Sequence, residues 1–562
     1  MVKVRSQKVN LEVLVLTALI LVLLAGQARP MPPHPDVQEL IESGQVHKPL
    51  ILESITRGTE RLKVNTQSIA NGTNATGTFK VLCLLVDFSD KVSRVSSTLF
   101  DSLIFADQAG TVRDYFAETS YGQLDIVAVT LPSSLGWYEA PQSYAYYVDN
   151  NYGTDSPYPN NSQKLCEDLV DLADPNVDFS QYDNDGDGHV DVVIIVHAGQ
   201  GAELTGRSTD IWSHKWSIPP RQRDGVSILD YTVMPEYWLS SGDITIGVFC
   251  HELGHAFGLP DLYDTDGSSK GVGDWSLMST GSWNGYLGDS PAHPDAWCKA
   301  QLGWIDPVTV TLNLTNQSIP AVESNPTVYK IPVDGGSANE YFLVENRQKI
   351  GYDAHLPGEG LLIWHIDDQA THNQYEWYPG HTIFGHYLVA LEQADNLYQL
   401  EKNIASGDAG DPFPGNSSNV SFTPGTSPSS EAYDGSGGYV SIVNISASGP
   451  VMTADFVVSL VAVDEETPIL PQFELGQNYP NPFNPVTSIS YSIQAESMVE
   501  IYIYNTLGQK VRKLVNRRYS PGNYTVIWDG TDNEGRGLPT GIYLYKLITD
   551  ESSLARKMLL IK

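Results

Sequence analysis

Residues 249–264, FCHELGHAFGLPDLYD, contain the pattern around which the first half of this chain can be interpreted. His251 and His255 are four residues apart, so on a helix both imidazoles project from one face and can reach one cation. Glu252 lies beside them, where it can act on a metal-bound water instead of on the metal. The spacing therefore predicts a zinc-binding helix, and a zinc site of this kind needs a third protein ligand.

The residues that follow the histidines indicate where this third ligand comes from. Gly258 stands where the helix would end, and the Leu259-Pro260 pair prevents the helix from continuing. Asp261 comes six residues after His255, in a position to return a carboxylate oxygen to the same ion. We predict that Asp261 is the third ligand.

Other third ligands are less consistent with the sequence. A glutamate from a later helix is the competing design, but the next glutamate after Glu252 is Glu323, beyond the apparent end of the domain. Asp264, Asp266 and His293 stay open as alternatives to Asp261.

The segments around the histidines predict an α/β domain over residues 79–306. FKVLCLLVDFSD (79–90) and DVVIIVH (191–197) are apolar runs typical of buried strands, and a third strand is expected near 123–130. Helices are expected over 95–106, 110–118 and 244–259. Strands and helices thus alternate, as in an α/β fold.

The second half of the chain predicts β structure. Short strands separated by turn residues suggest a β-sandwich domain over 307–463, followed by a linker at 464–472 and a separate β domain at 473–562. Within the sandwich region, GDAGDPFPGN (407–416) is interpreted as a plain loop, with an oxygen-rich binding loop as the alternative.

The N-terminal residues predict export. A basic start, an apolar run and a small-residue exit make residues 1–28 a signal peptide, and residues 29–78 a pro-segment or a disordered leader. No later segment is long and apolar enough to span a membrane. The formal charge of −34 argues against nucleic acid, because phosphate binding needs a basic face. The four cysteines are expected to be buried thiols, with one disulfide as the alternative.

A second cation site is predicted at YDNDGDGHVD (182–191). The acidic residues alternate, a glycine allows a sharp turn, and a histidine could offer a carbonyl, which together suggest a calcium loop. The EF-hand acid at the twelfth position is missing, so this is not an EF-hand, and a solvated acidic turn is the alternative. The tentative calcium ligands are Asp183, Asp185, Asp187, His189 and Asp191.

The region 79–306 resembles a known family. HELGHAFGLPD matches the extended metzincin pattern with aspartate last, and GDWSLMSTGSW (273–283) resembles its Met-turn, with Met278 beneath the metal. LLVDFSD, TVRDYFAETSYGQLDI, YDNDGDGHVDVVIIVHAGQGAE and HPDAWCKAQLGWI resemble the immune inhibitor A family of secreted metallopeptidases. The resemblance implies a secreted zinc endopeptidase of the metzincin class, with His251, His255 and Asp261 as ligands and Glu252 as general base. Some metzincins carry a tyrosine two residues after the methionine, where this chain has Thr280.

The resemblance also suggests partners. Metzincins hold a peptide against a sheet edge, for which HAGQGAE (197–203) is a candidate, with a plain turn as the alternative. The C-terminal block, with LGQNYPNPFNPVTSISYSI and WDGTDNEGRGLPTGIYLYKL, is similar to FlgD-like immunoglobulin-fold and type IX sorting domains. That similarity implies export or surface attachment in a bacterium with an outer membrane, and a passive β module is the alternative. Two other functions stay open: a surface binding protein with a degenerate peptidase fold, and a metal-dependent hydrolase of another substrate.

Overall fold

The computed structural model divides the chain into two compact units, Met1–Val461 and Ala462–Lys562. The residues that it describes are 29–49, 52, 75–333, 339–381, 385–436, 438–458, 473–478, 481–493, 497–519, 522–533, 536–550 and 552–561. The predicted signal peptide (1–28) and the predicted linker (464–472) lie outside the described residues.

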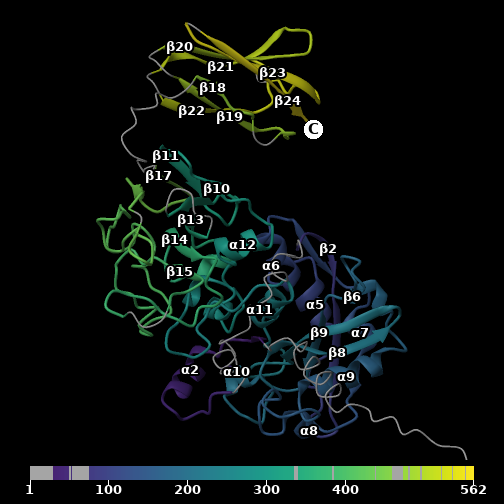
Figure 1. The fold of residues 1–562 in the computed structure, drawn as a ribbon. Coiled ribbons are helices and arrows are strands. Elements are labelled where there is room, and N and C mark those ends of the chain that lie inside the picture. Colours follow the sequence, from purple (N-terminus) through teal and green to yellow (C-terminus); the bar gives the residue numbers. More distant parts are fainter. Residues whose placement is uncertain are drawn as a thin grey trace, which may run out of the picture. The chain divides into compact units, whose positions relative to one another are not determined.

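A mixed sheet forms the centre of the first half of the first unit (Figure 1). Its path is β1 (Arg29–Pro30), β8 (His214–Arg223), β9 (Val226–Pro235), β7 (Val193–His197), β3 (Leu82–Asp87) and β5 (Trp137–Glu139), and β6 (His189–Val190) pairs with β9. The strands β5, β3, β7 and β9 are parallel, whereas β8 runs antiparallel to β9 and β1 antiparallel to β8. A short parallel pair, β2 (Gly77–Lys80) and β4 (Leu124–Val127), lies apart from this sheet.

Helices cover both faces of the sheet, which explains the continuous apolar sequence of its central strands. Along β3, Cys83 and Leu85 belong to one core, and Leu82, Leu84 and Val86 to the other, as the two-residue period of a strand requires. The helices of this region are α2 (Pro35–Glu42), α5 (Thr98–Phe105), α6 (Val112–Thr119), α7 (Pro132–Leu135), α8 (Tyr144–Val148), α9 (Ser162–Ala173), α10 (Ala202–Thr205), α11 (Gly247–Ala256) and α12 (Ala296–Gln301). Apolar residues of α5, α6 and α11 line the first core, and those of α8 and α9 the second.

The predicted strands at 79–90 and 191–197 and the helix at 244–259 are confirmed, with shorter bounds. Helix α9 and the β8–β9 hairpin were not predicted. The interpretation of residues 197–203 as a sheet edge is wrong, because β7 lies between β9 and β3. The edge beyond β9 is β8, and β1 covers it.

Two further sheets follow in the same unit. One contains β10 (Val308–Thr309), β12 (Tyr329–Pro332), β13 (Glu340–Arg347), β14 (Gly360–Asp367) and β15 (Val389–Leu391), and the other contains β11 (Leu314–Pro320), β17 (Val451–Val458) and β16 (Val440–Val443). Both contribute to one apolar core. A separate sandwich domain at 307–463 stays a prediction, since these strands fall in the same compact unit as the central sheet.

The second unit has two sheets around its own core. They are β18 (Glu474–Leu475), β19 (Thr487–Ile493) and β22 (Gly522–Trp528), and β21 (Lys510–Tyr519), β20 (Ser497–Tyr504), β23 (Gly541–Ile548) and β24 (Ser553–Leu560). Strand β21, KVRKLVNRRY, was not predicted because its many charged residues hide the alternation of a strand.

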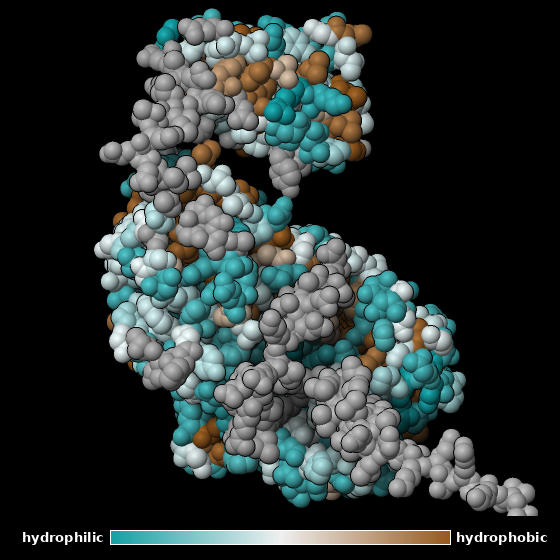
Figure 2. Space-filling model, viewed as in Figure 1, coloured by the Kyte–Doolittle hydropathy of each residue, from teal (hydrophilic) through white to brown (hydrophobic). Residues whose placement is uncertain are grey.

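The visible surface of the first unit is largely hydrophilic with small apolar patches (Figure 2), as expected for a chain with a formal charge of −34. Among the described residues, no helix has the length and apolar character needed to cross a membrane. All four cysteines are buried and unpaired, as the sequence suggested.

Candidate metal centre

The candidate metal centre is built on α11 and the turn that ends it. Every residue from Gly247 to His255 is buried, so this helix passes through the core. At its end, Gly258 has a φ of 97°, a conformation that favours glycine. The Gly258 amide donates to the His255 carbonyl and the Leu259 amide to the Gly254 carbonyl, which is the Schellman arrangement. This turn sends the chain back along the helix toward the histidines.

The turn brings Asp261 to both histidines. Its Oδ1 lies 3.5 Å from His251 Nε2 and 3.0 Å from His255 Nε2. Donor atoms around a tetrahedral zinc with bonds of about 2.0–2.2 Å are separated by about 3.4 Å, close to these distances. One donor atom from each of the three residues lies within 4.8 Å of the others.

The outer nitrogens of the two imidazoles are fixed by main-chain carbonyls. His251 Nδ1 is 2.9 Å from the Leu277 carbonyl, and His255 Nδ1 is 2.9 Å from the Leu259 carbonyl. Donation from each Nδ1 makes the neutral tautomer whose Nε2 is a free acceptor. These carbonyls have no sequence signature, which is why the sequence does not identify them as part of the site.

The inner atoms of the site are buried without protein partners. His251 Nε2, His255 Nε2 and Asp261 Oδ1 have no hydrogen-bond partner among the residues described. Buried polar atoms are rarely left in this state unless a ligand, ion or water satisfies them. Two imidazole nitrogens and a carboxylate oxygen, with a fourth position open, are the donor set of a catalytic zinc. The residues present therefore fit this metal.

The protonation of the candidate ligands reflects their burial. Burial lowers the pKa of His255 to about 4, against the opposing charge of Asp261, which favours the neutral, metal-binding form. Burial alone would raise the pKa of Asp261, but the two histidines hold it below its usual value. His255 and Asp261 are thus in the forms that bind a cation at neutral pH.

Glu252 is fully buried next to the ligands. Both of its carboxylate oxygens lack a hydrogen-bond partner within the described part of the chain. Burial, and then the charges of Asp261 and Glu203, raise the pKa of Glu252 well above its usual value. A nearby cation would oppose that shift and favour the carboxylate.

Met278 packs directly beneath α11. A Cβ placed on Gly254 would lie 2.5 Å from Met278 Sδ, so only a glycine between the two histidines leaves room for the thioether. The Met278 carbonyl also accepts a hydrogen bond of 2.8 Å from the Leu262 amide, on the segment that carries Asp261. The structure thus places Met278 against Gly254, between the two histidines of α11.

The alternative third ligands point elsewhere. Asp264 accepts hydrogen bonds from Ser268 and Ser269, whereas His293 lies between Glu118 and Lys299. Asp266 accepts from the Ser268 amide. Of the four carboxylate and imidazole candidates, Asp261 alone contacts both His251 and His255 in the part of the chain that the structure describes.

The predicted calcium loop is only partly assembled. Asp183, Asp185 and Asp187 offer oxygens within 4.8 Å of one another. Asp191 instead accepts two hydrogen bonds from Asn184, and the side chain of His189 is exposed. Backbone amides of the same loop donate to Asp183, Asp185 and Asp187.

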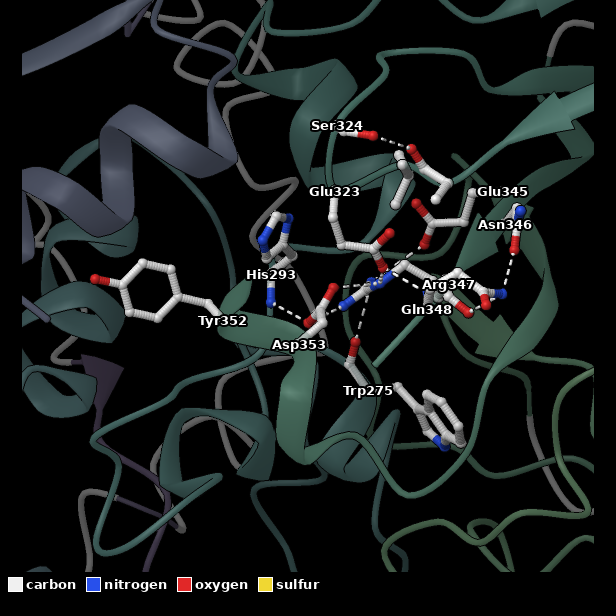
Figure 3. A network of polar contacts seen from close by, with 12 residues as sticks. Trp275, His293, Glu323, Ser324, Glu345, Asn346, Arg347, Gln348, Tyr352 and Asp353 are labelled. Atoms are coloured by element: carbon white, nitrogen blue, oxygen red, sulfur yellow. Dashed lines mark hydrogen bonds and ion pairs between the residues drawn. The ribbon is translucent and has the colours of Figure 1, made fainter. Parts of the chain in front are cut away.

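A buried ionic network supports the segment beneath the histidines (Figure 3). The guanidinium of Arg347, on β13, forms two hydrogen bonds with Asp353, of 2.8 and 2.7 Å, and one of 3.3 Å with Glu345. It also donates to the Trp275 carbonyl at 3.5 Å. Since Arg347, Glu345 and Asp353 are fully buried, this network fixes β13 against the segment 273–283.

The N-terminal segment lies across the same site. The Arg29 guanidinium donates to the Leu259 carbonyl, and Tyr263 donates to the Pro30 carbonyl at 2.8 Å. The indole of Trp212 donates to the Met31 carbonyl at 2.8 Å. These contacts and the β1–β8 pairing place residues 29–31 beside the candidate ligands.

Two parts of the chain are similar to known protein families. Residues 65–305 match the family model described as "Immune inhibitor A peptidase M6, catalytic domain", and residues 486–553 match "FlgD Ig-like domain". The pre-pro-metalloprotease PrtV of Vibrio cholerae is 29% identical over 300 residues, or 42% of this chain and 31% of that protein. Immune inhibitor A of Bacillus thuringiensis is 28% identical over 302 residues, 43% of this chain and 42% of that protein.

The chain therefore covers less than half the length of each of these curated relatives. Among solved structures, OgpA from Akkermansia muciniphila aligns with 86% of this chain and 92% of its own, at 12% identity and a TM-score of 0.21. That score is too low to support a conclusion about function.

Proposed function

We propose that this chain is a secreted, zinc-dependent endopeptidase that hydrolyses extracellular proteins, because residues 65–305 match the model of the peptidase M6 catalytic domain of immune inhibitor A. The observation that carries the proposal is the convergence of His251 Nε2, His255 Nε2 and Asp261 Oδ1, all buried and without partners among the described residues. His251, His255 and Asp261 would hold the metal. Zinc, when bound, lowers the pKa of its water and polarises the scissile carbonyl.

The remaining chemistry belongs to residues of the chain. Glu252, buried and unpaired beside the ligands, would take a proton as general base and deliver it to the leaving amine. The edge of β8, which β1 occupies here, would pair with the backbone of an extended substrate. Met278 would support the ligands from below through its contact at Gly254.

We propose that the part of residues 29–78 that precedes the peptidase domain at 65–305 is a pro-segment. Residues 29–31 occupy the β8 edge and bond to Leu259, the residue whose carbonyl also orients His255. A substrate strand could not pair with β8 while β1 remains there. Removal of this segment would therefore expose both the edge and the metal centre.

The other parts of the proposal concern location and calcium. The FlgD Ig-like domain at 486–553 would direct export or attachment to the surface of a bacterial cell. Asp183, Asp185 and Asp187 would bind a structural calcium ion, for which their proximity is the support.

The test is casein hydrolysis by the processed protein, with and without a zinc chelator, beside Glu252→Gln and a matched Glu139→Gln control at an exposed site. We expect the chelator and Glu252→Gln to abolish cleavage, with zinc content unchanged in Glu252→Gln, while Glu139→Gln stays active. Equal cleavage by wild type and Glu252→Gln would refute the role of Glu252. A processed wild type that holds zinc but cleaves no protein would favour a binding protein instead.

A further inference from the structure

A third group of carboxylates lies in the β-rich part of the first unit. Asp395 follows β15, and Asp408 and Asp411 belong to the loop GDAGDPFPGN (407–416). One oxygen from each of the three lies within 4.8 Å of the others. A Cβ placed on Gly410 would lie 2.4 Å from Asp395 Oδ2 and 2.9 Å from Asp408 Oδ1, so the carboxylates converge in the space that this glycine leaves.

The buried member of this group has an oxygen with no partner. Asp411 is 1% exposed, and its Oδ2 accepts from Trp275 Nε1 at 3.1 Å and from the Asp408 amide at 2.9 Å. Its Oδ1 is buried without a hydrogen-bond partner in the described part of the chain. Within the part of the chain that the structure describes, no lysine, arginine or histidine forms an ion pair with Asp395, Asp408 or Asp411.

Such a group is costly to bury without a counter-charge. Burial raises the pKa of Asp411 to about 7 and also raises the pKa of Asp395. A buried carboxylate with one unsatisfied oxygen and no neighbouring positive charge destabilises the fold unless a cation compensates it. The loop at 183–187 is different, because none of its three aspartates is buried, whereas Asp411 is.

We propose that Asp395, Asp408 and Asp411 bind a calcium ion. Calcium takes six to eight oxygen ligands in irregular geometry, which suits three carboxylates carried by loops. Zinc prefers nitrogen and sulfur, and magnesium demands a smaller and more regular shell. The ion would supply the positive charge that the buried Asp411 lacks.

The position of this site connects it to the candidate metal centre. Asp411 bonds the Trp275 indole, and the Asp274 amide donates to the Ser406 carbonyl at 2.7 Å. A Cβ on Gly407 would lie 2.6 Å from Trp275 Nε1, so this loop closely contacts the segment 273–283. That segment carries Met278 and the Leu277 carbonyl that orients His251. Calcium would thus stabilise segment 273–283, which supports the zinc ligands. This consequence rests on the proposed function, but the proposal that calcium binds here does not.

The test measures calcium on the full chain after treatment with a calcium chelator. Equilibrium dialysis compares wild type, Asp395→Asn/Asp408→Asn, the variant Asp183→Asn/Asp185→Asn of the other proposed calcium loop, and a matched Asp107→Asn/Asp434→Asn control at two exposed positions. We expect Asp395→Asn/Asp408→Asn to bind one calcium ion fewer than wild type and to lose most of the calcium-dependent rise in melting temperature. Terbium luminescence excited through tryptophan should persist in Asp183→Asn/Asp185→Asn and fall in Trp275→Phe, since Trp275 contacts Asp411.

Each result decides a separate statement. Full calcium binding and an unchanged melting response in Asp395→Asn/Asp408→Asn would overturn the site. If that variant fails to fold, Gly410→Ala serves instead, because its Cβ would occupy the space between the carboxylates, and unaltered calcium binding there would equally overturn the site. If Asp395→Asn/Asp408→Asn loses calcium but retains its zinc and its peptidase activity, calcium does not act on the zinc ligands through segment 273–283. If Asp395→Asn/Asp408→Asn loses calcium and the processed wild-type protein cleaves no protein, the calcium site is supported and the proposed function is refuted.

Discussion

Substitution of Gly254 is the sharpest test of how Met278 supports α11, the helix that carries the two histidines (the metal helix). In most helices, Gly→Ala stabilises by up to about 1 kcal/mol, because alanine has the higher helix propensity. Here the new Cβ would lie 2.5 Å from Met278 Sδ, so the sulfur must move by about 1 Å to reach an ordinary contact. Met278 is fully buried, and overpacking a core costs about 1–3 kcal/mol. We expect Gly254→Ala to be destabilising by up to about 2 kcal/mol after the helix gain is subtracted.

The assay is thermal melting of the metal-free protein together with zinc content after dialysis. A loss of up to about 2 kcal/mol lowers the melting temperature of a domain of this size by up to about 8 °C. Gly449→Ala is the matched control, since no atom lies within 4 Å of its added Cβ. The double variant Gly254→Ala/Met278→Ala should recover part of the loss, because the smaller side chain makes room for the methyl group. A Gly254→Ala protein that melts at or above wild type and retains its zinc would refute the role of this contact.

Three other predictions follow from the same unit. Asp261→Asn should lose bound zinc while the protein still folds, as measured by metal analysis and circular dichroism, and unchanged zinc would move the third ligand elsewhere. Burial would raise the pKa of Asp353, but the charge of Arg347 lowers it to about 2. The ion pair between Asp353 and Arg347 should therefore stabilise the fold fully above about pH 4 and progressively less toward pH 2. The free energy of unfolding of Asp353→Asn should therefore be about 3–5 kcal/mol lower than that of wild type at neutral pH. This difference, measured by denaturant unfolding, should shrink on acidification, and a difference that stays constant with pH would contradict the prediction. Arg29→Ala removes a charged donor to the Leu259 carbonyl and should raise the activity of the unprocessed chain about tenfold, as measured with a peptide substrate; equal latency would argue against the inhibitory contact.

The sequence was sufficient for the local features of the metal helix. The four-residue spacing of His251 and His255 determines a shared face on any helix. Gly258 and Pro260 determine where that helix must end, and the observed Schellman turn follows directly from the glycine. The buried strands were equally predictable, because sheets covered on both faces need continuous apolar runs.

Only the tertiary structure could decide contacts between residues that are distant in the sequence. The carbonyls of Leu277 and Leu259 orient the histidines through main-chain atoms that every residue carries, so no side-chain pattern announces them. The same limit explains the mistaken sheet edge at 197–203: strand order depends on which strands pair, and β9 and β3 flank β7. In the loop 407–416, the acidic residues were visible in the sequence. Their approach to Asp395 and the buried, unpaired oxygen of Asp411 exist only once the chain is folded, because burial is a property of the packed molecule.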